Sequence, residues 1–268
     1  MGSDAKMAEA DFILLDSVDS TNTYARSHFD ELSDGCVVAA VEQFAGRGRL
    51  GRRWESGRGL SVTASAVLKK VAQPFHAGAV VGLAGLELVR ECVPREFAFL
   101  KWPNDIYIDD CKVSGILSEG VIASGQLRGV VSGIGINVNN DLRHLRDSGV
   151  RAVSLREVSG APFFVEKLRR ELANKIRKYY IMYQFDLARL LAKWREENRL
   201  IGETLVLDLP SGASRRGEFC AITESGEMLL RDADGRMFRF DCGDVKIDAA
   251  LIDFERLKRN FINIKREV

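Results

Sequence analysis

The stretch EQFAGRGRLGRRW, residues 42–54, carries residue types that bind phosphate. Its glycines fit two motifs at once: Gly46-x-Gly48-x-x-Gly51 is a dinucleotide fingerprint, and Gly46 with Gly51 makes half of a Walker loop. Neither motif has its required context. A dinucleotide fingerprint needs a helix after the glycines, but RRWESGRGLS is polar, broken by glycine and leads into a strand. A Walker loop needs Lys and then Ser or Thr where this chain has two arginines.

The loop instead offers guanidinium groups spaced by glycines. Guanidinium forks match the geometry of carboxylate and phosphate oxygens, and several together suit a ligand that bears both groups. The glycines leave the backbone free to close over such a ligand. The alternative is a solvated surface loop. The arginines concerned are Arg47, Arg49, Arg52, Arg53 and Arg58.

A second stretch, KWPNDIYIDDCKVSGILSE at 101–119, gathers polar side chains around a predicted hairpin, with Pro103 fixing the turn into it. Gly115, inside a predicted strand, indicates close approach by a ligand or another backbone. Side chains alternate between the two faces of a strand. We therefore expect Lys112 to share a face with Ser114, Ile116 and Ser118, and Gly115 to share the other with Val113, Leu117 and Glu119.

These segments need a scaffold, and the apolar pattern predicts an α+β fold. Helices are expected after Ser20 or Thr21, which could cap the first one, at 75–92, and once or twice within 164–200. Tight turns such as Asp109-Asp110 and Ser124-Gly125 require antiparallel pairing. We expect a mixed, largely antiparallel sheet flanked by helices, with strands at 12–15, 35–43, 60–68, 97–103, 105–109, 111–122 and 127–138.

The character of the chain changes near Ile201. Five short strands separated by turn signals predict a small β-barrel, and residues after Ile247 show helical spacing. The expected domains are 1–200, 201–247 and a helical tail of unknown role at 248–268. The basic helix within 164–200 alternates its cations with glutamates, which favours a solvated face; its basic residues are Lys167, Arg169, Arg170, Lys175, Arg177 and Lys178.

Composition narrows the class of protein. The 268 residues carry a net charge of +1, so binding of nucleic acid or of an anionic membrane through global charge is disfavoured. The sequence shows no signal peptide and no apolar run long enough to span a bilayer. Five scattered cysteines without a C-x-x-C pair favour a reducing cytoplasm, and three isolated histidines argue against a metal centre held by the protein.

Five motifs in order make the chain similar to a known family. They are STN at 20–22, GRGRLGRRW at 46–54, KWPNDI at 101–106, KVSGIL at 112–117 and GIGINVN at 133–139. Together they resemble biotin protein ligases, the biotin–[acetyl-CoA-carboxylase] ligases, over the catalytic domain and a C-terminal SH3-like barrel. The resemblance implies a class II synthetase-like fold. It also implies that ATP and biotin, with Mg²⁺, give biotinyl-5′-AMP, from which biotin passes to a lysine of a biotin carboxyl carrier protein.

The resemblance assigns roles to particular residues. Lys112 would bridge the biotin carboxylate and the α-phosphate, and Arg49 would hold the adenylate, as the two catalytic residues. The implied biotin-binding residues are Ser20, Thr21, Asn22, Gln43, Arg47, Gly48, Arg49, Lys112 and Gly115. The implied ATP-binding residues are Arg49, Arg52, Trp54, Lys101, Asn104, Asp105 and Asn137.

Some alternatives remain open. Asp105 could meet a magnesium ion that arrives with the substrate, or it could be an ordinary turn residue. Ser20 and Thr21 could serve only as helix caps. A lipoate-protein ligase shares the fold but carries an Arg-Arg-x-Ser-Gly-Gly-Gly loop that is missing here, and a non-catalytic binding module is a further alternative. The chain begins at the catalytic strand, which disfavours a DNA-binding regulator, and it could be a monomer or a homodimer.

Overall fold

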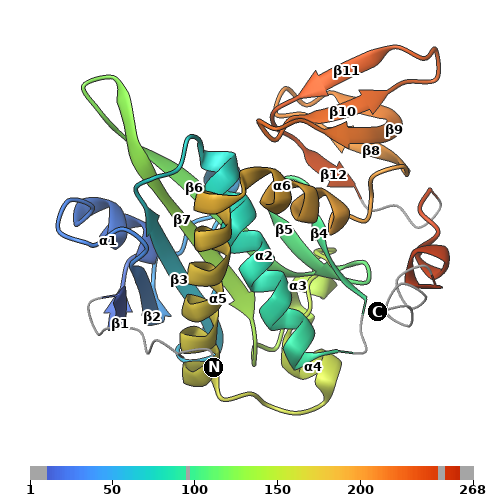
Figure 1. Ribbon diagram of the computed structural model, residues 1–268. Helices are drawn as coiled ribbons and strands as arrows, with labels where there is room; N and C mark the ends of the chain where they lie inside the picture. Colours follow the sequence, from blue (N-terminus) through green and yellow to red (C-terminus); the bar gives the residue numbers. More distant parts are fainter. Residues whose placement is uncertain (1–10, 95–96, 247–250, 260–268) are drawn as a thin grey trace, which may run out of the picture.

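The computed structural model describes residues 11–94, 97–246 and 251–259, and within them seven strands form one mixed sheet (Figure 1). The strand order is β1-β2-β3-β7-β6-β5-β4. β1 and β2 run parallel and the other neighbours run antiparallel, which confirms the expected fold class. The strands are β1 (Phe12–Val18), β2 (Val37–Gln43), β3 (Ser61–Leu68), β4 (Ala98–Lys101), β5 (Asp105–Ile108), β6 (Cys111–Ala123) and β7 (Gln126–Asn137).

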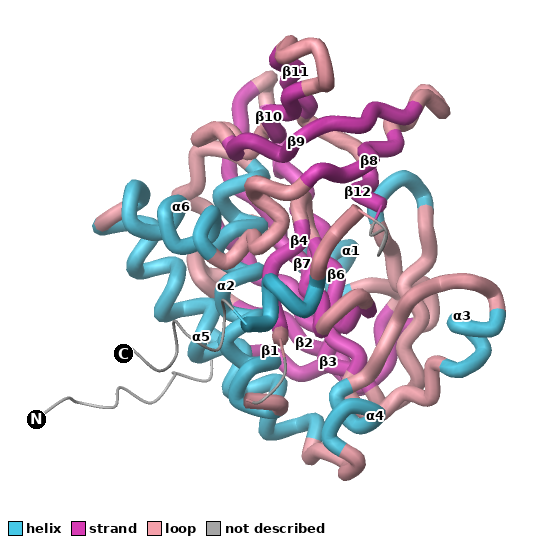
Figure 2. Tube along the Cα trace, turned by 90° about the vertical axis from the view of Figure 1, so that its right-hand side faces the viewer, coloured by secondary structure: helices cyan, strands magenta, loops and turns pink. Residues whose placement is uncertain are grey.

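Three helices cover one face of this sheet: α2 (Pro74–Cys92), α5 (Val165–Phe185) and α6 (Leu187–Glu196). Figure 2 shows them on one side of the strands, with α3 and its loops on the other. The main core lies under these helices. α2 approaches the sheet closely, because a Cβ built on Gly85 would lie 2.5 Å from Ile134 Cδ1. Glycine at this position therefore lets the helix backbone pack directly on the strands.

Helix α1 (Thr21–Ser27) packs on the opposite face. Its Ala25 belongs to a second core that includes Val38 and Val67, whereas the strand neighbours Ala66 and Leu68 belong to the main core under α2 and α5. Alternate residues of one strand point to opposite faces, so α1 and α2 lie on different sides of the sheet. The face that carries α1 therefore remains open to other segments.

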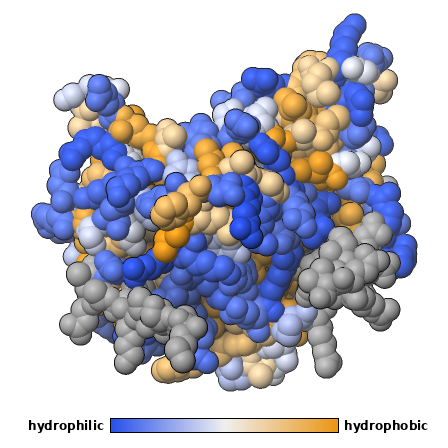
Figure 3. All heavy atoms as spheres, viewed as in Figure 1, coloured by the Kyte–Doolittle hydropathy of each residue, from blue (hydrophilic) through white to orange (hydrophobic). Residues whose placement is uncertain are grey.

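The outer side of α5 is mainly hydrophilic, as Figure 3 shows. Lys167, Arg170 and Glu166 are exposed there, in agreement with the sequence interpretation. Arg169 contradicts it. This side chain is 3% exposed and donates from Nη2 to the Ser61 carbonyl at 3.1 Å, and burial lowers its pKa. A basic residue in an alternating pattern can still face the core when a strand-end carbonyl accepts its hydrogen bond.

The tail forms a second antiparallel sheet, as expected for an SH3-like barrel. In the part of the chain described after Ile201, five strands pair in the order β11-β10-β9-β8-β12. The barrel is joined to the part that holds the seven-stranded sheet by hydrogen bonds, such as Trp102 Nε1 to the Gly226 carbonyl at 2.8 Å. The strands are β8 (Thr204–Asp208), β9 (Ser214–Ile222), β10 (Met228–Arg231), β11 (Met237–Phe240) and β12 (Asp244–Lys246).

Two short helices were not predicted, α3 (Arg143–Asp147) and α4 (Leu155–Ser159). A signal for α4 was present in the sequence, because Ser154 and Glu157 form a capping box that begins it. The expected helical tail is only partly described: residues 254–259 are helical, whereas Phe261 and Ile264, part of the expected pattern, lie outside the described residues.

Candidate active site

A cavity of about 550 Å³ opens on the α1 face of the sheet, within the size range of small-molecule sites. Strands β6 and β7 form its floor, α1 and the residue 46–54 loop form two walls, and the segment before α4 forms a third. Every site residue named from the sequence lines it: Ser20, Thr21, Asn22, Gln43, Arg47, Gly48, Arg49, Arg52, Trp54, Lys101, Asn104, Asp105, Lys112, Gly115 and Asn137.

The floor of the cavity consists of glycines from the KVSGIL and GIGINVN motifs. A Cβ built on Gly135 would collide with the Trp54 indole, and one on Gly133 would collide with the Asn22 amide. A Cβ on Gly115 would lie 3.3 Å from Trp54 Cζ3. A side chain at Gly133 or Gly135 would therefore collide with its neighbours, and one at Gly115 would be crowded, which explains glycine inside strands where it otherwise weakens the element.

Lys112 reaches this floor through a β-bulge. The β5–β6 register shifts, so that Ile106 pairs with Ser114 but Tyr107 pairs with Lys112. The expected alternation is therefore wrong at Lys112: its Nζ lies 3.1 Å from a Cβ built on Gly115, on the same side of the strand. The bulge turns the lysine into the cavity, a common use of bulges beside active sites.

The Lys112 ammonium group forms an ion pair with Asp105, with 2.6 Å between Nζ and Oδ1. Lys101 lies 3.9 Å from the other oxygen of the same carboxylate. Lys101 is buried, and desolvation lowers its pKa, while the charge of Asp105 opposes this shift and those of Lys112 and Arg49 add to it. The charge of Asp244 also opposes the shift, so the cations Lys101, Lys112 and Arg49 outnumber the two carboxylates here, which suits an anionic ligand.

Asp105 does not fit a metal centre held by the protein. Its carboxylate is already shared between Lys101 and Lys112. Among the residues that the structure describes, no group of three or more His, Cys, Asp or Glu side chains could hold an ion.

The opposite end of the cavity is a hydrogen-bonded cluster. The Thr21 N–H donates to Gln43 Oε1 at 2.7 Å, and Thr21 Oγ1 lies 2.9 Å from the same oxygen. Ser65 Oγ lies 2.7 Å from Thr21 Oγ1 and 2.6 Å from Asn22 Oδ1. The last three contacts share only two hydroxyl hydrogens. The cluster is therefore short of one donor, which favours a ligand that brings N–H groups.

Ser20 occupies the N-cap position of α1, but its side chain makes no capping bond within the described part of the chain. It is 4% exposed and lines the cavity. Ser20 is therefore the N-cap residue by position, but its hydroxyl group does not cap the helix.

The arginine loop is a small hairpin folded over the cavity. Gly48 N–H donates to the Arg52 carbonyl at 2.7 Å, and Trp54 N–H donates to the Gly46 carbonyl at 3.0 Å. Arg49 Nη1 donates to Asn104 Oδ1 at 2.9 Å, which ties the loop to the KWPND segment.

Two residues near this loop lie away from the cavity. Arg58 pairs with Asp16 and Glu42 outside it, so grouping Arg58 with the ligand-facing arginines was wrong. Phe44, next to Gln43 in the chain, is 61% exposed and does not line the cavity.

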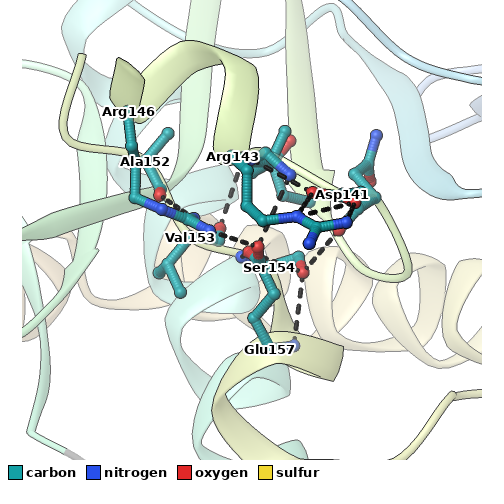
Figure 4. Close-up of polar contacts among 10 residues, drawn as sticks. Asp141, Arg143, Arg146, Ala152, Val153, Ser154 and Glu157 are labelled. Atoms are coloured by element: carbon teal, nitrogen blue, oxygen red, sulfur yellow. Dashed lines mark hydrogen bonds and ion pairs between the residues drawn. The ribbon is translucent and has the colours of Figure 1, made fainter. Parts of the chain in front are cut away.

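Sequence reasoning missed the third wall, residues 141–153. Leu142, Leu145, Val150, Arg151 and Ala152 line the cavity there. Figure 4 shows how the segment is held: Arg146 donates to the Ala152 carbonyl at 3.0 Å and to Glu157 Oε1 at 2.7 Å. The capping box around Glu157 was the available signal.

The barrel also contributes to the cavity through Asp244 and Val245 of β12, and Asp244 pairs with Arg52 of the loop. Nothing local in the sequence marks these two residues. Their position depends on how the barrel packs against the part that holds the seven-stranded sheet.

Comparison with known proteins agrees with this geometry. The pattern of the Biotin/lipoate A/B protein ligase family matches residues 14–137. The biotin–[acetyl-CoA-carboxylase] ligase of Mycobacterium tuberculosis is 32% identical over 225 residues, which cover 79% of each chain. The chain belongs to the biotin protein ligase family.

Two further family members extend the match. The bifunctional ligase/repressor BirA of Escherichia coli is 29% identical over 88% of this chain and 74% of its own length. The solved structure of the biotin protein ligase from Aquifex aeolicus, in complex with biotin and ATP, superposes with a TM-score of 0.73 at 26% identity. That match covers 88% of this chain and 97% of the Aquifex chain. The similarity to the biotin protein ligase fold therefore extends beyond residues 1–200 into the C-terminal part of the chain. Within the described residues, no helix is long and apolar enough to cross a membrane.

Proposed function

We propose that this biotin protein ligase joins biotin to ATP and then transfers the biotinyl group to a lysine of a carrier protein. In the first step a biotin carboxylate oxygen attacks the α-phosphorus, and pyrophosphate leaves with its bonding electrons. In the second step the acceptor amine attacks the acyl carbon of biotinyl-5′-AMP, AMP leaves, and the amine loses a proton. The known family members named above support this reaction class.

One observation carries the proposal: a cavity in which cations gather at one end and hydrogen-bonding groups short of a donor gather at the other. The first step brings two anions together, so it depends on charge neutralisation and positioning more than on a nucleophilic side chain. Lys112 is turned into the cavity beside Asp105. We assign it to the biotin carboxylate and the α-phosphate, with Asp105 holding its ammonium group in place until the substrates arrive.

The donor-poor cluster suits the ureido ring of biotin. A ureido N–H would donate to Gln43 Oε1 in place of the Thr21 hydroxyl group. The buried side chains of Asn22 and Ser20 would complete the walls around the ring. Buried N–H and C=O groups are costly to leave unpaired, so this end selects for a head group of that kind. Lipoate has no ureido ring, so it would bring no N–H donor to this cluster.

The remaining assignments concern the nucleotide. Lys101 and Asn104 lie at the cationic end, and Asn137 donates from Nδ2 to the Val153 carbonyl at 3.4 Å beside the third wall. We place the ATP phosphates near Lys101 and Arg52, and the nucleoside near Trp54 and the segment 141–153. Magnesium would enter bound to the ATP phosphates. Asp105 would not hold the ion alone, because its carboxylate already pairs with Lys101 and Lys112. The five free thiols fit a reducing compartment such as the cytoplasm.

The proposal is tested by pyrophosphate exchange into ATP with the purified protein. We expect exchange that depends on biotin. Exchange that depends on lipoate instead would replace the proposal with a lipoate ligase, and no exchange with either acid would leave a binding protein. Transfer is then checked with an isolated biotin carboxyl carrier domain and a variant of it without the acceptor lysine.

A further inference from the structure

Glu119 joins the two walls at the head-group end of the cavity, although nothing in the reaction itself requires it. Its carboxylate accepts two hydrogen bonds from Arg47 of the loop, at 2.7 and 3.2 Å. From α1 it accepts one from Asn22 Nδ2 at 2.8 Å and one from Arg26 at 2.9 Å. The Glu119 side chain is only 19% exposed, so these contacts are partly shielded from solvent.

Asn22 connects this carboxylate to the cluster of hydroxyl groups. Its amide is held in one orientation, because Nδ2 donates to the Leu117 carbonyl at 3.0 Å as well as to Glu119, while Oδ1 faces Ser65 Oγ. Ser65 in turn contacts Thr21. A continuous series of polar contacts therefore runs from Thr21 through Ser65 and Asn22 to Glu119, and on to Arg47.

We propose that Glu119 is a positioning residue that holds the arginine loop closed by tying Arg47 to Asn22 and Arg26 of α1. The inference rests on the function proposed above for this cavity, and it adds to it the group that orders the loop. With the carboxylate charge removed, Arg47 loses its partner and the loop opens at its first turn. Lys112 and Asp105, at the other end of the cavity, keep their contact.

The first readout is limited trypsin digestion without ligand, because trypsin cleaves after arginine and the loop carries Arg47, Arg49, Arg52 and Arg53. We expect Glu119→Gln to raise the rate of cleavage in the loop roughly tenfold, since hydrogen bonds to charged groups are worth a factor of this order. Glu119→Asp, which keeps the charge, should recover part of the protection. The matched control is Glu42→Gln, because Glu42 pairs with Arg58 on the outside of the cavity.

The second readout is kinetic. For Glu119→Gln we expect the KM for biotin to rise roughly tenfold, with the KM for ATP and the kcat of exchange changed by less than a factor of about two. Arg47→Gln breaks the same contact from the other side. The double variant should then be no worse than the poorer single variant, because the two changes remove one shared interaction.

These results separate the inference from the proposed function. Loop cleavage in Glu119→Gln that matches the wild type and the Glu42→Gln control would overturn the inference, even if exchange requires biotin. Additive effects of the two substitutions on the KM for biotin would also overturn it. Conversely, wild-type protein without biotin-dependent exchange refutes the proposed function, while the digestion still decides whether Glu119 holds the loop.

Discussion

Lys112 Nζ lies 2.6 Å from Asp105 Oδ1, across neighbouring strands whose register shifts between Ile106 and Tyr107. Without that shift, Lys112 would follow the alternation of β6 and point away from Gly115. The relationship fixes a cation at the floor of the cavity and pairs it with a carboxylate that an incoming anion can replace.

Lys112→Ala should lower biotin-dependent pyrophosphate exchange by at least about a hundredfold, because it removes the charge that neutralises both reacting anions. The protein should stay folded, since Lys112 is partly exposed and Asp105 keeps Lys101 as a partner. Exchange kinetics and thermal unfolding measure the two effects. Lys193→Ala, on the surface of α6, is the control, and near-normal exchange in Lys112→Ala would refute the placement of the reacting centre.

Arg49→Gly should still form the adenylate but release it. The Arg49 guanidinium ties the loop to Asn104 over the cavity, and its loss removes part of the cover over a reactive anhydride. The expected result is biotin attached to lysines of an unrelated bystander protein, detected by avidin blotting. Arg58→Gly serves as the control, because Arg58 pairs outside the cavity. Tightly retained adenylate in Arg49→Gly would contradict the assignment.

Gly135→Ala should impair biotin-dependent exchange roughly tenfold or more, because the added methyl group collides with the Trp54 indole and narrows the cavity. Gly120→Ala, in the neighbouring strand β6, adds a methyl group whose closest neighbour is the flexible end of Leu127, with Pro74 at ordinary contact distance, and should change exchange little. Equal activity of both variants would show that the floor tolerates a side chain.

Glu157→Gln should weaken nucleotide binding more than biotin binding. Glu157 anchors the third wall through Arg146 and Ser154, and these contacts lower its pKa against the opposing effect of burial. We expect a KM for ATP raised roughly tenfold and a KM for biotin within about twofold. A uniform loss of both would indicate general destabilisation, which thermal unfolding would detect.

Glu87 should make stability depend on acid pH. Burial alone would raise the pKa of this carboxyl group, but hydrogen bonds from Lys178, Tyr179 and Lys175 of α5 outweigh it and lower the pKa to about 2. A folded-state pKa below the unfolded value stabilises the fold above the unfolded pKa of 4.5, and this contribution is lost as pH falls toward 2.

Replacing Glu87 tests that contribution. Glu87→Gln should cost on the order of 2–3 kcal/mol of unfolding free energy at pH 7. The difference from the wild type should shrink steadily below about pH 4.5, as denaturant titrations at several pH values would measure. A difference that stays constant down to pH 2.5 would show that the charge is not its source.

Local sequence signals predicted much of this protein. Gly115, the GIGINVN motif, the arginine loop and the KWPND segment were recognisable because each is a short stretch with a distinctive set of residue types. The strands were predictable for a similar reason, since each has a continuous apolar or small-residue pattern.

Relationships between distant segments could not be predicted. The bulge that turns Lys112 depends on the pairing of β5 with β6, and Arg169 is buried because a carbonyl of β3 accepts its hydrogen bond. The third wall has no periodic pattern, so only its capping box marked its end. Asp244 reaches the cavity through the docking of the barrel, and no stretch of sequence encodes that contact by itself.

The contribution of β12 to the cavity has a consequence for protein engineering. Asp244 and Val245 line the cavity together with residues of the first two hundred. Trp102, next to Lys101 in the chain, donates a hydrogen bond to the Gly226 carbonyl in a turn of the barrel. A chimera that takes residues 201–268 from another ligase would therefore have a different wall at this side of the cavity, even with residues 1–200 left unchanged. Grafting experiments with this enzyme should exchange β12 and the loop that holds Arg52 as a matched set.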